Sequence, residues 1–206
     1  MREVTPTKSE ALALAEERKL MREGFEFLDE KRMLLAGEIL RQLALFERRN
    51  AELEDARKQA FEALGAAIER HGLEELQAMQ PAEPFVAPKA SASAFLGVKL
   101  LHLKEAEPGS GPSASLDALH LTPEAKAAAA AFGRLAGTML ETGLLAGNLL
   151  RLAREYRRTE RRAKALENVL LPEVSAMLRH VNEQLDALDQ EEAIRAHTFS
   201  RSASEG

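Results

Sequence analysis

The chain has 206 residues, of which 45% are hydrophobic, 4% aromatic and 30% charged, and its formal net charge is −5. The hydrophobic content argues against wholesale disorder, and the scarcity of aromatic residues argues against sandwiches, barrels and doubly wound sheets, whose cores depend on aromatic and β-branched side chains. Because the chain contains no cysteine, it has no disulfide framework, thiolate zinc site or cysteine nucleophile.

Residues 1–80 are predicted to form one helical arm. No proline lies between Pro6 and Pro81, so the backbone hydrogen-bond ladder of a helix is not interrupted there. Two apolar rows follow heptad spacing: Leu14, Met21, Leu28 and Leu35 form the first, and Phe25, Ile39, Phe46, Leu53 and Ala60 the second. This pattern predicts a coiled-coil helix, which at about 1.5 Å per residue would be on the order of 100 Å long.

The middle of the chain, residues 81–122, differs from both ends because prolines crowd it. Residues 93–103 form the only run with strand character, and residues 116–121 offer a second, weaker strand. Between them, Gly109-Ser110-Gly111 lacks the Lys-Ser/Thr and helix start of a phosphate-binding loop, so we interpret it as a turn. These features predict a small β-hairpin.

Residues 123–206 are predicted to form the second helical arm and a polar tail, with Thr122 as the N-cap. The apolar positions alternate in steps of three and four: Leu145, Leu149, Leu152, Tyr156, Thr159, Ala163, Leu166 and Leu170, then Val174, Leu178, Val181, Leu185 and Leu188. The phase slips by one near Pro172, which predicts a kink. Charged residues interrupt the most apolar stretch, residues 132–153, and argue against insertion into a membrane.

Each amphipathic arm needs a partner for its apolar stripe, and the other arm can supply it. We therefore expect an all-α protein: a long antiparallel two-helix coiled coil formed by the N- and C-terminal helices, with both termini at one end of a rod. The middle segment would reverse the chain and carry the hairpin.

No group of residues rises above chance as a catalytic, cofactor-binding or metal site, since the five histidines show no metal-ligand spacing. The strongest charge feature is a basic run: Arg151, Arg154, Arg157, Arg158, Arg161, Arg162 and Lys164. It is consistent with a solvated coiled-coil face or with a docking surface for an acidic protein. Nucleic acid is disfavoured because the net charge is negative and no aromatic residues interleave with the arginines.

Several short motifs match a known family in order along the chain. They are Pro6-Thr7-Lys8, Glu30-Lys31-Arg32, Leu96-Gly97-Val98-Lys99, the block from Arg161-Arg162-Ala163-Lys164-Ala165-Leu166-Glu167 to Pro172, and Glu191-Glu192. Together they resemble the D subunit of the V-type (vacuolar/archaeal) ATPases. Lys164 stands where that family usually has Asn.

The resemblance implies a non-catalytic central rotor shaft without a cofactor. It implies partners as well: the F subunit of the central stalk, the catalytic A and regulatory B subunits, and the funnel-shaped subunit above the proteolipid ring. The expected location is the cytoplasm, peripheral to the inner (plasma) membrane. The residues expected to contact partners are Lys31, Arg32, Arg158, Arg161, Arg162, Lys164, Glu167, Gly97 and Val98.

The main alternative is a holdase chaperone of the prefoldin kind, which also has two coiled-coil arms flanking hairpin strands. Only one strand run here is convincing, and the C-terminal tail is polar rather than apolar. Assembly into a hexamer would favour the chaperone, and a one-to-one complex with a small α/β protein would favour the shaft. A coiled-coil adaptor without a rotary role is a third possibility.

Overall fold

The structure is a computed structural model that describes residues 5–78, 89–103 and 122–204. The elements are α1 (Lys8–Ala78), β1 (Ala90–Phe95), β2 (Val98–Leu103), α2 (Pro123–Ala165), the π-helical turn η2 (Leu166–Leu170) and α3 (Leu171–Ser204). Two long helical arms with a small antiparallel hairpin between them in the sequence confirm the predicted fold class. The chain divides into two compact units, one of Met1–Leu34 with Arg157–Gly206 and one of Leu35–Tyr156.

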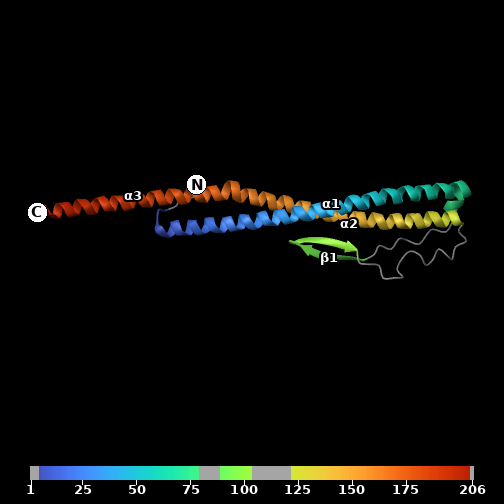
Figure 1. The fold of residues 1–206 in the computed structure, drawn as a ribbon, viewed down its shortest axis with the longest axis horizontal. Coiled ribbons are helices and arrows are strands. Elements are labelled where there is room, and N and C mark those ends of the chain that lie inside the picture. Colours follow the sequence, from blue (N-terminus) through green and yellow to red (C-terminus); the bar gives the residue numbers. More distant parts are fainter. Residues whose placement is uncertain (1–4, 79–88, 104–121, 205–206) are drawn as a thin grey trace. The chain divides into compact units, whose positions relative to one another are not determined.

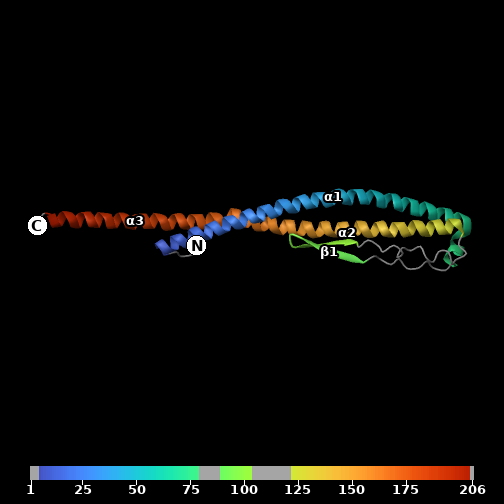
Figure 2. The same cartoon turned by 60° about the horizontal axis from the view of Figure 1, so that its bottom comes forward.

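In the first unit, the start of α1 lies antiparallel to η2 and α3 (Figure 2). Leu14 packs against Val174, Leu178 and Val181, and all four side chains are at most 8% exposed. Farther along α1, Gly24 lies next to Leu166, because a Cβ added at Gly24 would be 3.9 Å from the Leu166 side chain. Residue numbers therefore rise along α1 while they fall along the partner helix, as in an antiparallel pair. The heptad rows thus predicted the seam of this unit as far as Leu185, whereas Leu188, predicted in the same row, is 49% exposed.

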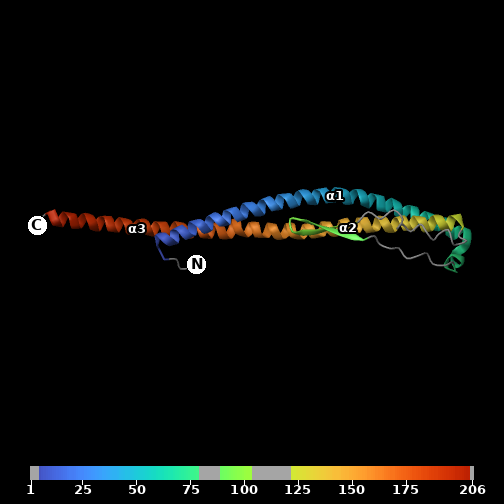
Figure 3. The same ribbon diagram turned by 90° about the horizontal axis from the view of Figure 1, so that it is seen from below.

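In the second unit, the rest of α1 runs antiparallel to α2, as Figures 1 and 3 show. Arg49 lies 3.4 Å from Glu141, and His71 Nε2 lies 2.6 Å from the Thr122 hydroxyl. The seam has two clusters of buried residues: Leu35, Val98, Leu100 and Leu152 around the hairpin, and Ala60, Ala131 and Leu135 farther along. The hairpin therefore lies against the helix pair and belongs to the same core.

Threonine side chains cap the starts of both long helices, and of these the cap at Thr122 was predicted. Thr122 caps α2, since its hydroxyl accepts the Ala125 N–H at 3.5 Å and its carbonyl accepts the Lys126 N–H at 3.0 Å. Thr7 caps α1 in the same way through the Glu10 N–H at 3.2 Å. Gly72, with φ 73° and ψ 159°, kinks α1 near its end, because this left-handed conformation suits a residue without Cβ.

The phase slip near Pro172 has a more specific cause than a simple kink. The Leu171 N–H donates to the carbonyl of Leu166, five residues back, so η2 holds one residue more than an α-helical turn. A wide turn suits this position because the ring of Pro172 would clash with the carbonyl four residues before it. As a result Leu170, predicted in the seam, is 38% exposed, and the seam resumes at Val174.

The hairpin prediction is confirmed, but its strand assignment was wrong. Residues 93–103 do not form one strand: they break at Leu96-Gly97, and β2 pairs with β1, from Ala90 opposite Leu103 to Phe95 opposite Val98. The predicted partner strand, residues 116–121, lies outside the described residues. Leu96 and Gly97 have φ values of 48° and 85°, as the two central residues of a type I′ turn require.

Candidate functional site

An exposed basic surface covers part of the first unit. It consists of Arg157, Arg158, Arg161, Arg162 and Lys164, all exposed, near the end of α2. Lys164 Nζ pairs with Glu160 at 2.9 Å, and Arg161 Nε donates to the Arg157 carbonyl at 3.3 Å. Among the described residues, the guanidinium groups of Arg157, Arg158 and Arg162 have no carboxylate partner, so this surface presents unneutralised positive charge.

Helix α1 contributes to the same region of the first unit. Arg32 is half-buried and pairs with Asp29 at 2.5 Å. The hydrogen bond from Lys164 is the main cause that lowers the pKa of Glu160, and the positive charge of Arg32 lowers it further. Arg32 therefore lies close enough to act on α2, as the antiparallel arrangement predicts. Lys31 is half-buried beside it in the sequence.

The other predicted contact residues have different surroundings. Glu167 is exposed in η2, and Gly97 is exposed in the hairpin turn. Val98 is 6% exposed and packs with Leu35 and Leu152, so its side chain anchors the hairpin to the helices. Contact of these residues with partner subunits stays a prediction.

An apolar surface on α1 escaped the sequence interpretation. Leu20, Phe27 and Leu34 recur every seven residues in the first unit, and they are 68%, 65% and 49% exposed. In η2 of the same unit, Val169 is 58% exposed. A helix pair buries its apolar residues in one seam. An additional apolar row with seven-residue spacing on α1 was therefore the sequence signal that could have revealed this exposed surface. Exposed apolar patches of this kind mark sites of protein association.

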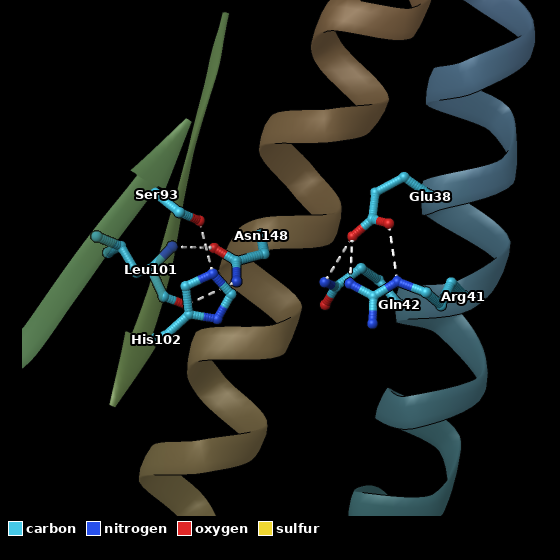
Figure 4. Close-up of polar contacts among 7 residues, drawn as sticks. All are labelled: Glu38, Arg41, Gln42, Ser93, Leu101, His102 and Asn148. Carbon is cyan, nitrogen blue, oxygen red and sulfur yellow. Dashed lines mark hydrogen bonds and ion pairs between the residues drawn. The ribbon is translucent and has the colours of Figure 1, made fainter. Parts of the chain in front are cut away.

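A polar cluster lies on α1 in the second unit, across α2 from the hairpin in the view of Figure 4. The Glu38 carboxylate accepts two hydrogen bonds from Arg41, at 2.8 and 2.6 Å, and one from Gln42 at 2.9 Å. The bonds from Arg41 lower the pKa of Glu38 despite the opposing effect of burial. Gln42 is 2% exposed, and its Oε1 has no hydrogen-bond partner among the residues that the structure describes.

On the other side of this cluster, α2 holds the hairpin through Asn148. Its side-chain amide accepts the Leu101 N–H at 2.9 Å and donates to the Leu101 carbonyl at 2.8 Å. On the hairpin itself, Ser93 Oγ lies 2.8 Å from His102 Nε2. Nothing in the sequence distinguished Asn148 from other polar residues on a helix.

Two features are absent from the described residues: a cluster that could hold a metal ion and a helix that could span a membrane. Within residues 5–78, 89–103 and 122–204, no three His, Asp or Glu side chains gather where they could hold a metal ion. In the same ranges, none of the helices has a stretch apolar and long enough to cross a bilayer. The absence of catalytic, cofactor and metal sites stays a prediction, and the surfaces above point to binding.

Comparisons with known proteins agree with the motifs. Residues 10–201 match the family model that describes the D subunit of ATP synthase. The V-type ATP synthase D subunit of Thermotoga neapolitana is 24% identical over 200 residues, which cover 93% of this chain and 94% of that protein. The Thermus thermophilus protein of the same name is 26% identical over 95% of this chain and 86% of its own length. The A-type ATP synthase D subunit of Methanosphaera stadtmanae is 25% identical, covering 91% and 89%.

Proposed function

The chain belongs to the D-subunit family of the ATP synthases, and from this membership we propose that it is the central rotor shaft of a V-type ATPase or ATP synthase. In this role it couples ATP hydrolysis or synthesis in the catalytic A/B hexamer to translocation of H⁺ or Na⁺ through the membrane ring. The match of the family model to residues 10–201 is the observation that carries the proposal. It also favours the shaft over the prefoldin-like holdase.

The physical properties of the helices suit a shaft. In each unit two helices pack along an apolar seam, and paired helices resist bending and twisting better than a single helix can. Polar residues interrupt the seam at Gln42, Thr142, Asn148 and Thr159, all buried. The chain itself carries out no catalysis in this proposal; it transmits torque.

The two exposed surfaces of the first unit suit different partners. We assign the basic surface to acidic loops of the surrounding A and B subunits, because its free guanidinium groups attract carboxylates and remain hydrated. We assign the apolar surface of Leu20, Phe27 and Leu34 to the F subunit, because a stable contact between subunits needs desolvated apolar side chains. The funnel-shaped subunit would connect the shaft to the proteolipid ring, which places the chain in the cytoplasm, peripheral to the inner (plasma) membrane.

The experiment that tests this proposal reverses the charge of Arg158, Arg161 and Arg162 together. In the assembled complex in vesicles, we expect ATP hydrolysis to continue while the number of ions pumped per ATP falls, because the reversed charges repel the acidic surface that transmits torque. A matched variant reverses Arg48, Lys58 and Arg70, which are exposed on α1 in the second unit. Normal pumping per ATP in the first variant, or equal loss in both, would count against the assignment.

A further inference from the structure

We propose that Asn148 locks the hairpin onto α2 by binding the main chain of Leu101 as a neighbouring β-strand would. This inference concerns the chain itself and does not depend on the proposed rotary function. Asn148 is a positioning residue: it holds β1 and β2 at one place against the helices.

The geometry of the contact is that of a strand pairing. A β-strand residue offers its N–H and C=O on the same side, and a neighbouring strand engages both. The Asn148 amide does the same, since Oδ1 accepts the Leu101 N–H at 2.9 Å and Nδ2 donates to the Leu101 carbonyl at 2.8 Å (Figure 4). Both hydrogen bonds come from one planar group, so the contact fixes orientation as well as distance.

The register of the hairpin explains why Leu101 is free to make this contact. In an antiparallel pair, residues alternate between those bonded to the partner strand and those whose backbone groups point outward. The two-residue turn closes on the pair Phe95 and Val98, so Ser93 with Leu100 is a bonded pair and Ala92 with Leu101 is not. The Leu101 N–H and C=O therefore point to the outer edge of β2, where Asn148 lies.

The burial of Asn148 explains why its contact with Leu101 stabilises the docked hairpin. Asn148 is 1% exposed, so its amide needs partners within the protein. Arg151, one turn along α2, donates a further hydrogen bond to Oδ1 at 2.9 Å. If the hairpin shifted or tilted while it stayed packed on α2, the Nδ2 donor and the Leu101 carbonyl would lose their bonds without gaining access to water. A partly satisfied buried polar group of this kind is costly.

The apolar contacts and the Asn148 amide restrain the hairpin in different ways. Val98 and Leu100 pack on Leu35 and Leu152, and this packing selects which part of β2 faces the helices. Apolar packing is not directional, so it leaves the tilt and the exposed edge of a two-stranded sheet undetermined. The Asn148 amide supplies that direction.

Asparagine is the side chain that suits this position. Leucine would fill the space but leave both Leu101 groups unpaired, and glutamine would place the amide one methylene too far. Aspartate is the informative variant. As a carboxylate it accepts but cannot donate, and its charge faces the Leu101 carbonyl; as a neutral acid it has one acceptor and one O–H donor, like the amide.

The decisive experiment measures hydrogen exchange at single amides in the full chain carrying Asn148→Ala or Asn148→Asp. Near neutral pH we expect protection of the Leu101 amide to fall about tenfold or more in Asn148→Ala, and by less in Asn148→Asp, whose carboxylate still accepts the Leu101 N–H but repels the Leu101 carbonyl. Protection of the Leu100 amide, which bonds within the hairpin, should change little. Thr142→Val is the matched control, because Thr142 is also a buried polar residue of α2 and, within the described part of the chain, its hydroxyl bonds to its own helix at the Thr138 carbonyl.

Measuring Leu101 protection in Asn148→Asp at lower pH distinguishes hydrogen bonding by residue 148 from apolar packing. In Asn148→Asp, Arg151 and the Leu101 N–H favour the carboxylate, whereas the Leu101 carbonyl favours the neutral acid. Protonation in acid restores an O–H donor for that carbonyl, so Leu101 protection should rise once the carboxyl group is protonated. The charged groups near the site are Arg151 on α2, His102 on β2, and Glu38 and Arg41 on α1. Adding His102→Gln to this variant removes the imidazole titration and should leave the recovery in place.

Three results would overturn the proposal. One is unchanged Leu101 protection in Asn148→Ala. Another is equal loss of protection at Leu100, Leu101 and the amides of α2, which would make Asn148 a general core residue. The third is an Asn148→Asp variant whose Leu101 protection, corrected for the intrinsic exchange rate, does not recover in acid.

Discussion

Two seams of this molecule follow the same heptad rule with side chains of different size. In the first unit, Leu14 packs against Val174, Leu178 and Val181, and we call this cluster the aliphatic seam. In the second unit, Ala60 packs against Ala131 and Leu135, and we call this cluster the alanine seam. In both seams, heptad spacing determines which residues face the partner helix. The volume of those side chains determines how much apolar area is buried between the helices.

The aliphatic seam derives its stability from buried area, since each branched side chain removes much apolar surface from water. The alanine seam buries less area per residue and lets the backbones approach closely. Larger apolar groups lie beside it: the rings of Phe61 and Phe132 meet edge to face, with centroids 5.9 Å apart. The two seams should therefore respond to opposite kinds of substitution.

The largest effect is expected from shortening a side chain in the aliphatic seam. Leu14→Ala should lower the free energy of unfolding by about 2–5 kcal/mol, because it removes buried methyl groups and leaves a cavity. Urea unfolding followed by circular dichroism measures this. Leu12→Ala is the matched control, since Leu12 is 67% exposed on the same turn of α1, and it should change stability by no more than about 0.5 kcal/mol. Equal losses in the two variants would mean that Leu14 does not pack in the seam.

A smaller effect of the opposite kind is expected from enlarging a side chain in the alanine seam. Ala60 is 0% exposed, so Ala60→Leu should destabilise the protein by about 1–3 kcal/mol through overpacking. The same unfolding measurement applies. Ala51→Leu, on an exposed position of α1, should be nearly neutral. A stabilising Ala60→Leu would show that the helices are not closely packed there, and the contrast between the seams would fail.

The sequence predicted the aliphatic seam and the α1 side of the alanine seam, because heptad spacing is a local property of each helix; Ala131 and Leu135 on α2 were not predicted. Leu35, Leu152, Ala163 and Val181, all predicted from spacing, are at most 2% exposed. Leu170 was misplaced because η2 adds a residue to the turn, and spacing alone cannot distinguish a wide turn from a kink at Pro172.

The hairpin and the binding surfaces were harder to predict. The turn at Leu96-Gly97 places a leucine at φ 48°, where Asn or Gly is usual, so the turn signal was weak and β1 was missed. The seven-residue spacing of Leu20, Phe27 and Leu34 was visible, but only burial shows that this row lies outside the seam. Asn148 was missed because its contact with Leu101 joins residues 47 positions apart.

Rotation of the chain inside the assembled complex is the most direct test of the central claim. A bead or gold particle is attached to an exposed position of the hairpin through Ala94→Cys on β1 in this cysteine-free chain, and the A/B hexamer is fixed to glass. We predict that the particle turns in one direction while ATP is hydrolysed and stops when ATP is withdrawn. A particle that stays fixed to the hexamer while hydrolysis continues would contradict the account.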